Sequence, residues 1–398
     1  MSNVLNLNNI GKNFLLSLET RGIKLGLKRT VELFNICNHP EDNLKSIQVI
    51  GTNGKGSTAA TLSSILMASG LKVGLYTSPH LVDLSERIKI NNQEIDNQFI
   101  DHFIDLYRHD IEKLESTFFE VLTVMAASYF NEKDVDIAIF ETGLGGRYDS
   151  VTACKAQTQL FTKISIDHAH ILGNTIEEIA LDKSCAIHKD STCFSIRQTN
   201  KVKNILIQKA IDMSASLTFT THLDNKVYKS NLLGSHQIEN TQLAIAAAKH
   251  IIDIKEDAIQ RGLNNVQWKG RMELLCSDPN VYFDVAHNDD SIIAFCDTID
   301  SLNYKGDKTL IISVQESKLI EKSIKQLEQR FSKIIITQLN NRMYASSDLA
   351  SMFLSQSKIE IIDDSNLAIK TGFKNSKKSD LLAIIGSHYW GDIVYKNF

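Results

Sequence analysis

The segment Ser46-Ile-Gln-Val-Ile50-Gly51-Thr-Asn-Gly-Lys-Gly-Ser57 joins a short β-branched run to a glycine-rich loop. This pattern predicts a strand over 46–50 and a helix that runs from the loop to about Ser69. Four residues of the helix are spaced to form one face: Leu62, Ile65, Leu66 and Ser69. A further apolar run at 71–76 predicts the next strand. Strands that alternate with helices are typical of an α/β protein with a mostly parallel sheet covered on both faces.

The alternation continues along the chain. Asp136–Glu141 predicts a buried strand that ends in an acid, and Gln159–Ile166 predicts another, which would end at Asp167 and His168. An alanine-rich amphipathic helix is expected at 237–252. After Gly270 a second series begins, with strands expected at 281–285, 309–314, 333–337, 358–362 and 381–385. We therefore expect two domains, 1–269 and 270–398, the second a smaller Rossmann-like α/β unit.

Length and composition exclude several classes of protein. The chain has 398 residues, of which 43% are hydrophobic and 23% charged, a balance that fits two globular domains. The net charge of 43 − 47 = −4 argues against a large basic surface for nucleic acid or anionic lipid. No apolar run approaches the roughly 20 residues that span a bilayer. Residues 1–10 also lack the features of a secretory signal. We expect a cytoplasmic protein with no nucleic-acid or membrane partner.

Cysteine usage supports the same compartment. The cysteines are scattered and form no CxxC pair: Cys37, Cys154, Cys185, Cys193, Cys276 and Cys296. In a chain of this size the pattern predicts reduced thiols and argues against a disulfide framework or a structural zinc site.

The loop 51–57 carries the strongest indication of function. A glycine-rich turn between a strand and a helix directs backbone N–H groups at phosphate oxygens, and Lys55 adds a positive charge. The loop differs from a Walker A motif in two places. Val49 occupies the position of the first glycine of that motif, and Gly56 replaces the serine or threonine whose hydroxyl usually binds magnesium. The alternative is a turn with one exposed lysine. We favour a nucleotide site whose metal ligands lie elsewhere.

Two side chains at strand ends are candidate ligands of that metal ion. Ser78 follows the strand at 71–76, and Glu141 closes the run 136–140, at the same edge of a parallel sheet as the loop. A turn serine and an exposed acid remain open alternatives. A second glycine-rich loop leads from Glu141 to Arg147, whose planar guanidinium suits a carboxylate or phosphate, or merely faces solvent.

Several motifs together resemble the folylpolyglutamate synthase/dihydrofolate synthase family of the Mur ligase superfamily, which are ATP-dependent amide-forming ligases. They cover nearly the whole chain in order: GTNGKGS (51–57), TSPHL (77–81), ETGLGGRYD (141–149), IDHAHILGNTIEEIALDK (166–183), GSHQIEN (234–240), GRMELL (270–275) and FDVAHN (283–288). The resemblance implies an N-terminal P-loop-type ATPase domain that binds ATP and folate, followed by a C-terminal glutamate ligase domain.

The resemblance also implies roles for single residues. Those matching the ATP site are Thr52, Asn53, Gly54, Lys55, Gly56, Ser57, Asn240, Arg271 and Asp284. Those matching the Mg²⁺ ligands are Ser78, Glu141 and His168. Lys183 matches a lysine carried as a carbamate, and His287 is expected to face the acyl phosphate or the incoming glutamate; with Lys55 these are the expected catalytic residues.

The resemblance also implies a folate-binding site formed by three further segments. Residues matching the pteroate or folate site are Lys24, Leu25, Gly26, Thr117, Phe118, Phe119, Glu120, Tyr148, Asp149 and Ser150. This chain departs from the family in several places: Lys24 replaces an acid, Tyr148 a leucine and Asp289 a proline.

The implied reaction is the ATP-dependent joining of L-glutamate to dihydropteroate and to tetrahydrofolate polyglutamates, by a monomer. Three alternatives stay open: a folylpolyglutamate synthase that does not use dihydropteroate, a Mur-type ligase of cell-wall precursors, and a nucleotide-binding regulator without catalysis.

Overall fold

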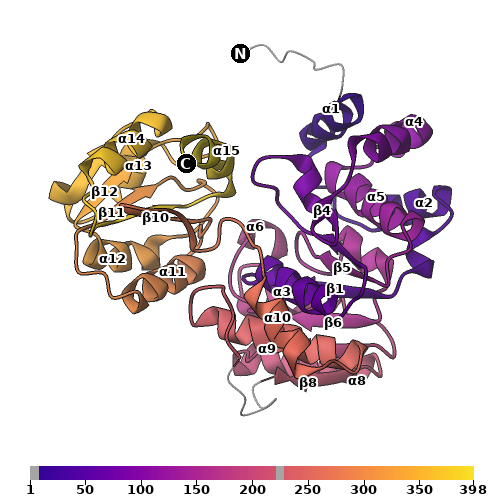
Figure 1. Ribbon diagram of the computed structural model, residues 1–398. Coiled ribbons are helices and arrows are strands. Elements are labelled where there is room, and N and C mark those ends of the chain that lie inside the picture. The colour runs from indigo at the N-terminus through magenta and orange to yellow at the C-terminus, as the bar shows by residue number, and fades with distance from the viewer. Residues whose placement is uncertain (1–8, 221–227) are drawn as a thin grey trace. The chain divides into compact units, whose positions relative to one another are not determined.

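The computed structural model describes residues 9–220 and 228–398 (Figure 1). Of the N-terminal segment that we examined for a secretory signal, residues 1–8 lie outside the described residues. The chain divides into two compact units, which we call unit 1 (Met1–Lys229 and Glu239–Val266) and unit 2 (Ser230–Ile238 and Gln267–Phe398).

Unit 1 is built on an eight-stranded sheet with the order β4-β3-β2-β5-β1-β6-β7-β8. The strands are β1 (Ser46–Ile50), β2 (Val73–Tyr76), β3 (Ile88–Ile90), β4 (Gln93–Glu94), β5 (Ile137–Glu141), β6 (Thr158–Phe161), β7 (Thr192–Ser195) and β8 (Ser216–Phe219). All neighbours from β2 to β8 pair in parallel, whereas β3 and β4 add an antiparallel edge. The prediction of a mostly parallel sheet is confirmed.

Helices cover both faces of this sheet (Figure 1). They are α1 (Ile10–Ser17), α2 (Lys28–Ile36), α3 (Lys55–Ala68), α4 (Asn97–Lys113), α5 (Phe118–Glu132), α6 (Ala169–Leu172), α7 (Ile176–Ser184), α8 (Asn200–Asp212), α9 (His236–Ile251) and α10 (Glu256–Asn264). Successive strand residues point to opposite faces, so Phe140 packs with α5 while Ile139 packs with α3 and α9. Two cores therefore sandwich the strands that carry the loops of interest.

Two expectations for unit 1 are wrong. Helix α3 has no single buried face, because it is buried continuously from Gly56 to Leu66. Its small residues allow α10 to pack closely, and Ser64 Oγ donates to the Gly262 carbonyl at 2.7 Å. The strand expected over 159–166 ends at Phe161, since Lys163 turns to the phosphate loop and its carbonyl accepts from Thr52 N at 2.7 Å.

Unit 2 holds a six-stranded sheet with the order β13-β12-β11-β14-β10-β9. Its strands are β9 (Glu273–Ser277), β10 (Asn280–Asp284), β11 (Lys308–Ile312), β12 (Lys333–Ile336), β13 (Ile359–Ile361) and β14 (Leu381–Ile385). Its helices are α11 (Asp289–Ser301), α12 (Glu321–Arg330), α13 (Ser346–Ser351), α14 (Ser365–Asn375) and α15 (Gly391–Asn397). The predicted strands of the second series all form. Strand β9, which the sequence did not indicate, pairs antiparallel with β10 and is the exception to an otherwise parallel sheet.

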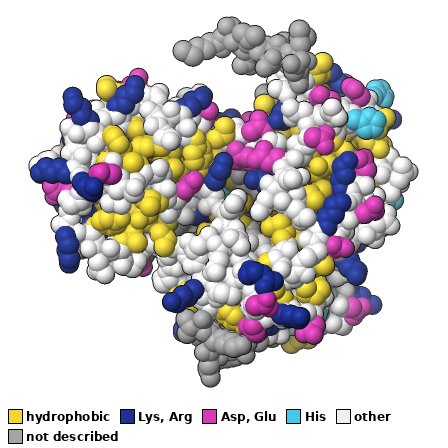
Figure 2. Space-filling model, in the orientation of Figure 1, with side chains coloured by type: hydrophobic (Ala, Val, Ile, Leu, Met, Phe, Trp, Pro, Cys, Tyr) yellow, Lys and Arg dark blue, Asp and Glu magenta, His cyan; other side chains and the backbone are white. Residues whose placement is uncertain are grey.

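The surface matches the near-neutral composition. In the face drawn in Figure 2, Lys and Arg side chains are scattered among acidic and neutral ones. Among the described residues, no helix combines the length and apolar character that crossing a bilayer requires.

Candidate functional site

The phosphate loop lies at the carboxyl end of β1, between neighbours β5 and β6. Gly54 has a positive φ of 88° and precedes the first residue of α3, which leaves the helix N-terminus open to the loop. The loop is held by the segment that follows β6, because Thr52 Oγ1 donates to the Ser165 carbonyl at 2.9 Å. Asn240, on α9, is buried against Gly54, where an added Cβ would lie 2.5 Å from Asn240 Oδ1. The loop and Asn240 thus form one continuous surface.

Two lysines converge on this loop. Lys55 Nζ donates to the carbonyls of Gly51 and Thr52, each at 3.2 Å, and Lys183 Nζ donates to the Gly51 carbonyl at 2.9 Å. Lys183 is buried on α7, with 4% of its surface exposed. Burial, reinforced by the charge of Lys55, lowers the pKa of Lys183 to about 7. A neutral amine is therefore accessible at this position near physiological pH.

The candidate metal ligands Ser78 and Glu141 lie at adjacent strand ends. Ser78 N donates to Glu141 Oε2 at 3.1 Å, and only 4% of Glu141 is exposed. A buried carboxylate beside a serine hydroxyl is an oxygen donor set that fits Mg²⁺. His168, which directly precedes α6, has a positive φ of 52° and lines the same cavity as Ser78. Its nitrogen is a less typical ligand for this ion.

Unit 1 contains a cavity of about 680 Å³ next to these ligands. Its lining includes residues from all three segments for which the resemblance implied folate binding: Lys24, Leu25, Thr117, Phe119, Glu120, Tyr148, Asp149 and Ser150. Of the implied residues, Gly26 and Phe118 lie outside this lining. The ring of Phe118 instead packs 5.0 Å from the guanidinium carbon of Arg87.

Asp149 is a buried acid of the cavity wall, with 5% of its surface exposed. Its carboxylate caps a 3-10 turn, accepting from Leu144 N at 2.8 Å and from Val151 N at 3.0 Å. Burial raises the pKa of Asp149 to about 6, against the opposing effect of these N–H donors. Its neighbour Tyr148 is 47% exposed, so a flat ligand could stack on its ring.

Arg87 is a cavity residue that the sequence did not single out. It is 8% exposed, and its Nε donates to His80 Nδ1 at 2.8 Å. Burial and this guanidinium lower the pKa of His80 to about 4, so the imidazole is neutral and accepts the bond. The signal in the sequence was Ser-Glu-Arg directly before the strand Ile88–Ile90, but nothing in that pattern distinguishes a buried arginine from a solvated one.

The implied residues of unit 2 lie together at the end of β10. Asp284 is 7% exposed and accepts from Met272 N at 2.9 Å and Ala286 N at 2.8 Å. Burial raises the pKa of Asp284, while the charge of Arg271 opposes that shift. His287 Nδ1 lies 2.7 Å from the Val285 carbonyl, which fixes the proton on Nδ1 because a carbonyl only accepts.

Comparisons with known proteins place these features in context. Residues 270–388 match the Mur ligase, glutamate ligase domain. The dihydrofolate synthase/folylpolyglutamate synthase of Bacillus subtilis is 31% identical over 93% of this chain and 94% of its own length. Among solved structures, the Mycobacterium tuberculosis folylpolyglutamate synthase complexed with ADP is 25% identical, with a TM-score of 0.89 over 97% of this chain and 98% of that one. The Thermotoga maritima folylpolyglutamate synthase is 27% identical, with a TM-score of 0.82 over 97% and 96% of the two chains.

Proposed function

Since the chain belongs to the dihydrofolate synthase/folylpolyglutamate synthase family, we propose that it joins L-glutamate to dihydropteroate and to tetrahydrofolate polyglutamates at the expense of ATP. The observation that carries this proposal is the 680 Å³ cavity, because the three implied folate segments and the metal candidates Ser78 and His168 line one space. A flat pteroate bound there would bring its carboxylate toward the edge of the sheet where the phosphate loop lies.

The first step is phosphoryl transfer. The amides of loop 51–57 and the N-terminus of α3 bind the ATP phosphates, with Asn240 beside the loop. A carboxylate oxygen of the folate attacks the γ-phosphorus, the bond to the β-phosphate oxygen breaks, and ADP leaves. Lys55 stabilises the charge on the transferred group. The product is an acyl phosphate on the substrate.

The second step is amide formation. The amine of glutamate attacks the acyl carbon, a tetrahedral intermediate forms, and phosphate leaves with the former carboxylate oxygen while the amine loses a proton. In unit 2 we assign Arg271 and Asp284 to the nucleotide, and His287 to the acyl phosphate or glutamate. We assign residues 1–269 to ATP and folate binding and 270–398 to the glutamate ligase domain. The protein positions the reactants and excludes water.

Mg²⁺ bound by Ser78, Glu141 and His168 would neutralise charge on the β- and γ-phosphates. Carbamylation of Lys183 is supported by its pKa of about 7, because CO₂ reacts with a neutral amine. A carbamate there would replace an ammonium by anionic oxygens next to the loop. We also propose that the protein acts as a monomer in the cytoplasm, with small-molecule partners only.

Lys55→Met tests the catalytic assignment. With dihydropteroate or tetrahydrofolate, Mg-ATP and labelled glutamate, we expect kcat to fall by about 10²–10³-fold, since a charge stabilising the transferred phosphoryl group is lost. The matched control is Lys201→Met, an exposed lysine paired with Glu177, which should retain full turnover. Near wild-type turnover by Lys55→Met would contradict the proposal.

One observation favours the monofunctional alternative. Lys24, in the segment that resembles the dihydropteroate-binding stretch, replaces an acid and pairs with Glu115 at 3.0 Å. Parallel assays decide between the two: ligation of tetrahydrofolate without ligation of dihydropteroate would establish the monofunctional enzyme.

A further inference from the structure

A short segment between the 3-10 turn Leu18–Arg21 and α2 runs along the wall of the cavity. We call residues 22–27 the strap. Gly22 and Gly26 have positive φ values of 62° and 120°, and a Cβ at either position would contact nothing within 4 Å. Ile23 and Leu25 line the cavity although they are 64% and 59% exposed. The strap therefore has a glycine at or near each end and two apolar side chains that its own packing does not bury.

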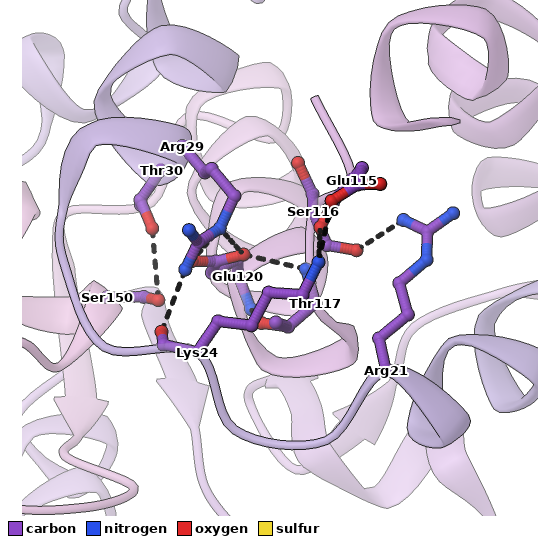
Figure 3. Close-up of polar contacts among 9 residues, drawn as sticks. All are labelled: Arg21, Lys24, Arg29, Thr30, Glu115, Ser116, Thr117, Glu120 and Ser150. Carbon is purple, nitrogen blue, oxygen red and sulfur yellow. Dashed lines mark hydrogen bonds and ion pairs between the residues drawn. The ribbon is translucent and has the colours of Figure 1, made fainter. Parts of the chain in front are cut away.

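Arginines flank the strap and hold it to the α4–α5 corner (Figure 3). On one side, Arg21 Nη1 donates to the Ser116 carbonyl at 2.6 Å. On the other, the Arg29 guanidinium lies between two partners: Nε donates to Glu120 Oε1 at 3.0 Å and Nη2 to the Lys24 carbonyl at 2.8 Å. Arg29 is thus the side chain that joins the middle of the strap to the first turn of α5.

The Glu120 carboxylate, which Arg29 contacts, already accepts hydrogen bonds from the protein at both oxygens. Glu120 is 3% exposed, and its Oε2 accepts from Thr117 N at 2.6 Å in the capping box of α5. Both oxygens therefore have protein donors, although Glu120 lines the cavity. This arrangement indicates that Glu120 supports the wall rather than binding the ligand directly. A buried carboxylate also requires a paired cation, which Arg29 supplies.

The next residue extends this connection to the third folate segment. Thr30 is fully buried, and its Oγ1 donates to Ser150 Oγ at 3.1 Å. The first turn of α2 therefore contacts 117–120 through Arg29 and 148–150 through Thr30, as Figure 3 shows. The ion pair of Lys24 with Glu115 adds little, since the two side chains are 33% and 74% exposed.

We propose that Arg29 is a positioning residue for the pteroyl substrate: by bridging the Glu120 carboxylate and the Lys24 carbonyl, it fixes the strap so that Ile23 and Leu25 meet the ligand. The proposal rests on the proposed function for the identity of the ligand. Arginine suits this role because its planar guanidinium donates in several fixed directions at once, whereas a lysine ammonium on a flexible stem cannot reproduce that geometry.

The test uses full-length Arg29→Met and Arg29→Lys. For Arg29→Met we expect the KM for tetrahydrofolate or dihydropteroate to rise by at least about tenfold, with kcat and the KM for ATP nearly unchanged. Arg29→Lys keeps a cation beside Glu120, so it should fold normally and still raise the KM for the folate. The matched control is Arg108→Met, which removes an exposed arginine paired with Glu112 on α4 and should change neither constant.

Hydrogen exchange of the ligand-free protein gives a readout that does not depend on activity. In both Arg29 variants the amides of the strap should exchange faster than in the wild type, while those of β1 and β5 keep their protection. Unchanged exchange of the strap, or a fall in kcat with an unchanged KM for the folate, would overturn the proposal. If the wild type ligates no pteroate at all, the proposed function fails, and the exchange result alone decides whether Arg29 holds the strap.

Discussion

Glu141 is the carboxylate for which burial and position together suggest a metal ligand. Glu141→Gln keeps the shape of the side chain but removes its charge. We expect the Mg²⁺ concentration needed for half-maximal turnover to rise by about tenfold or more, since metal affinity depends on the anionic ligand. The measurement is a Mg²⁺ titration of phosphate release at fixed ATP. Glu360→Gln, which alters an exposed acid paired with Lys333, serves as the control, and an equal titration curve for Glu141→Gln would remove Glu141 from the site.

Lys183 gives the molecule a specific dependence of stability on pH. Its pKa falls from the ordinary 10.5 to about 7 on folding, so between these values the unfolded state binds more protons. The free energy of unfolding attributable to Lys183 therefore rises as the pH increases from about 7 to about 10.5, and is lost as the pH falls through 7. In bicarbonate-free buffer, Lys183→Met should be stabilised relative to the wild type most strongly below pH 7. Urea unfolding at pH 6 and pH 9.5 measures this; equal differences at both values would contradict it.

At the scale of elements, the second glycine-rich loop (141–147) and α7 are in close backbone contact. A Cβ on Gly146 would lie 2.6 Å from the carbonyl oxygen and 2.8 Å from the Cα of Lys183, both backbone atoms. Gly146→Ala should therefore destabilise the protein by about 1–3 kcal/mol, as overpacking does, and displace α7.

The measurement is the midpoint and slope of urea unfolding. Gly372→Ala is the control, because a Cβ there would meet side-chain carbons rather than backbone, the nearest being the terminal methyls of Leu382 and Ile311 at 3.0 and 3.1 Å, and α14 gains a better helix former. A Gly146→Ala variant as stable as Gly372→Ala would show that the loop can move away from α7.

Much of this arrangement could be predicted from local patterns. Strands β1, β2 and β5 were expected because short β-branched or apolar runs precede glycine or polar turns, and the adjacency of Ser78 to Glu141 follows from their being strand ends of one parallel sheet. Burial of α3 on all sides could not be predicted, since its small residues become core only when α10 packs on them. The end of β6 depends on the contact of Lys163 with a loop more than a hundred residues earlier.

The same limit applies to the candidate site. Glycine-rich loops and polar residues at strand ends can be recognised in the sequence as candidate site residues, whereas Arg87 and Arg29 cannot. Each becomes informative only through folding, which buries Arg87 beside His80 and buries Glu120 beside Arg29. His168 and Lys183 were assigned by resemblance alone, and the burial of Lys183 is a tertiary property that helix periodicity does not encode.

At the scale of the whole molecule, each unit has its own buried hydrophobic residues and its own mostly parallel sheet. The cavity that we propose for the pteroyl group is lined by residues of unit 1, and Asp284 and His287 belong to unit 2. We propose that the two units have different roles. Unit 1 binds the folate carboxylic acid and contains the phosphate loop, and unit 2 contains residues 270–388, which match the glutamate ligase domain.

The most direct test of the account follows oxygen atoms. Dihydropteroate labelled with ¹⁸O in its carboxylate is incubated with the protein, Mg-ATP and L-glutamate, and the released phosphate is analysed by mass spectrometry. Activation through an acyl phosphate predicts one ¹⁸O in the phosphate for every amide formed, because the attacking carboxylate oxygen leaves with phosphorus. Unlabelled phosphate accompanying amide formation, or label recovered in AMP, would contradict the central claim.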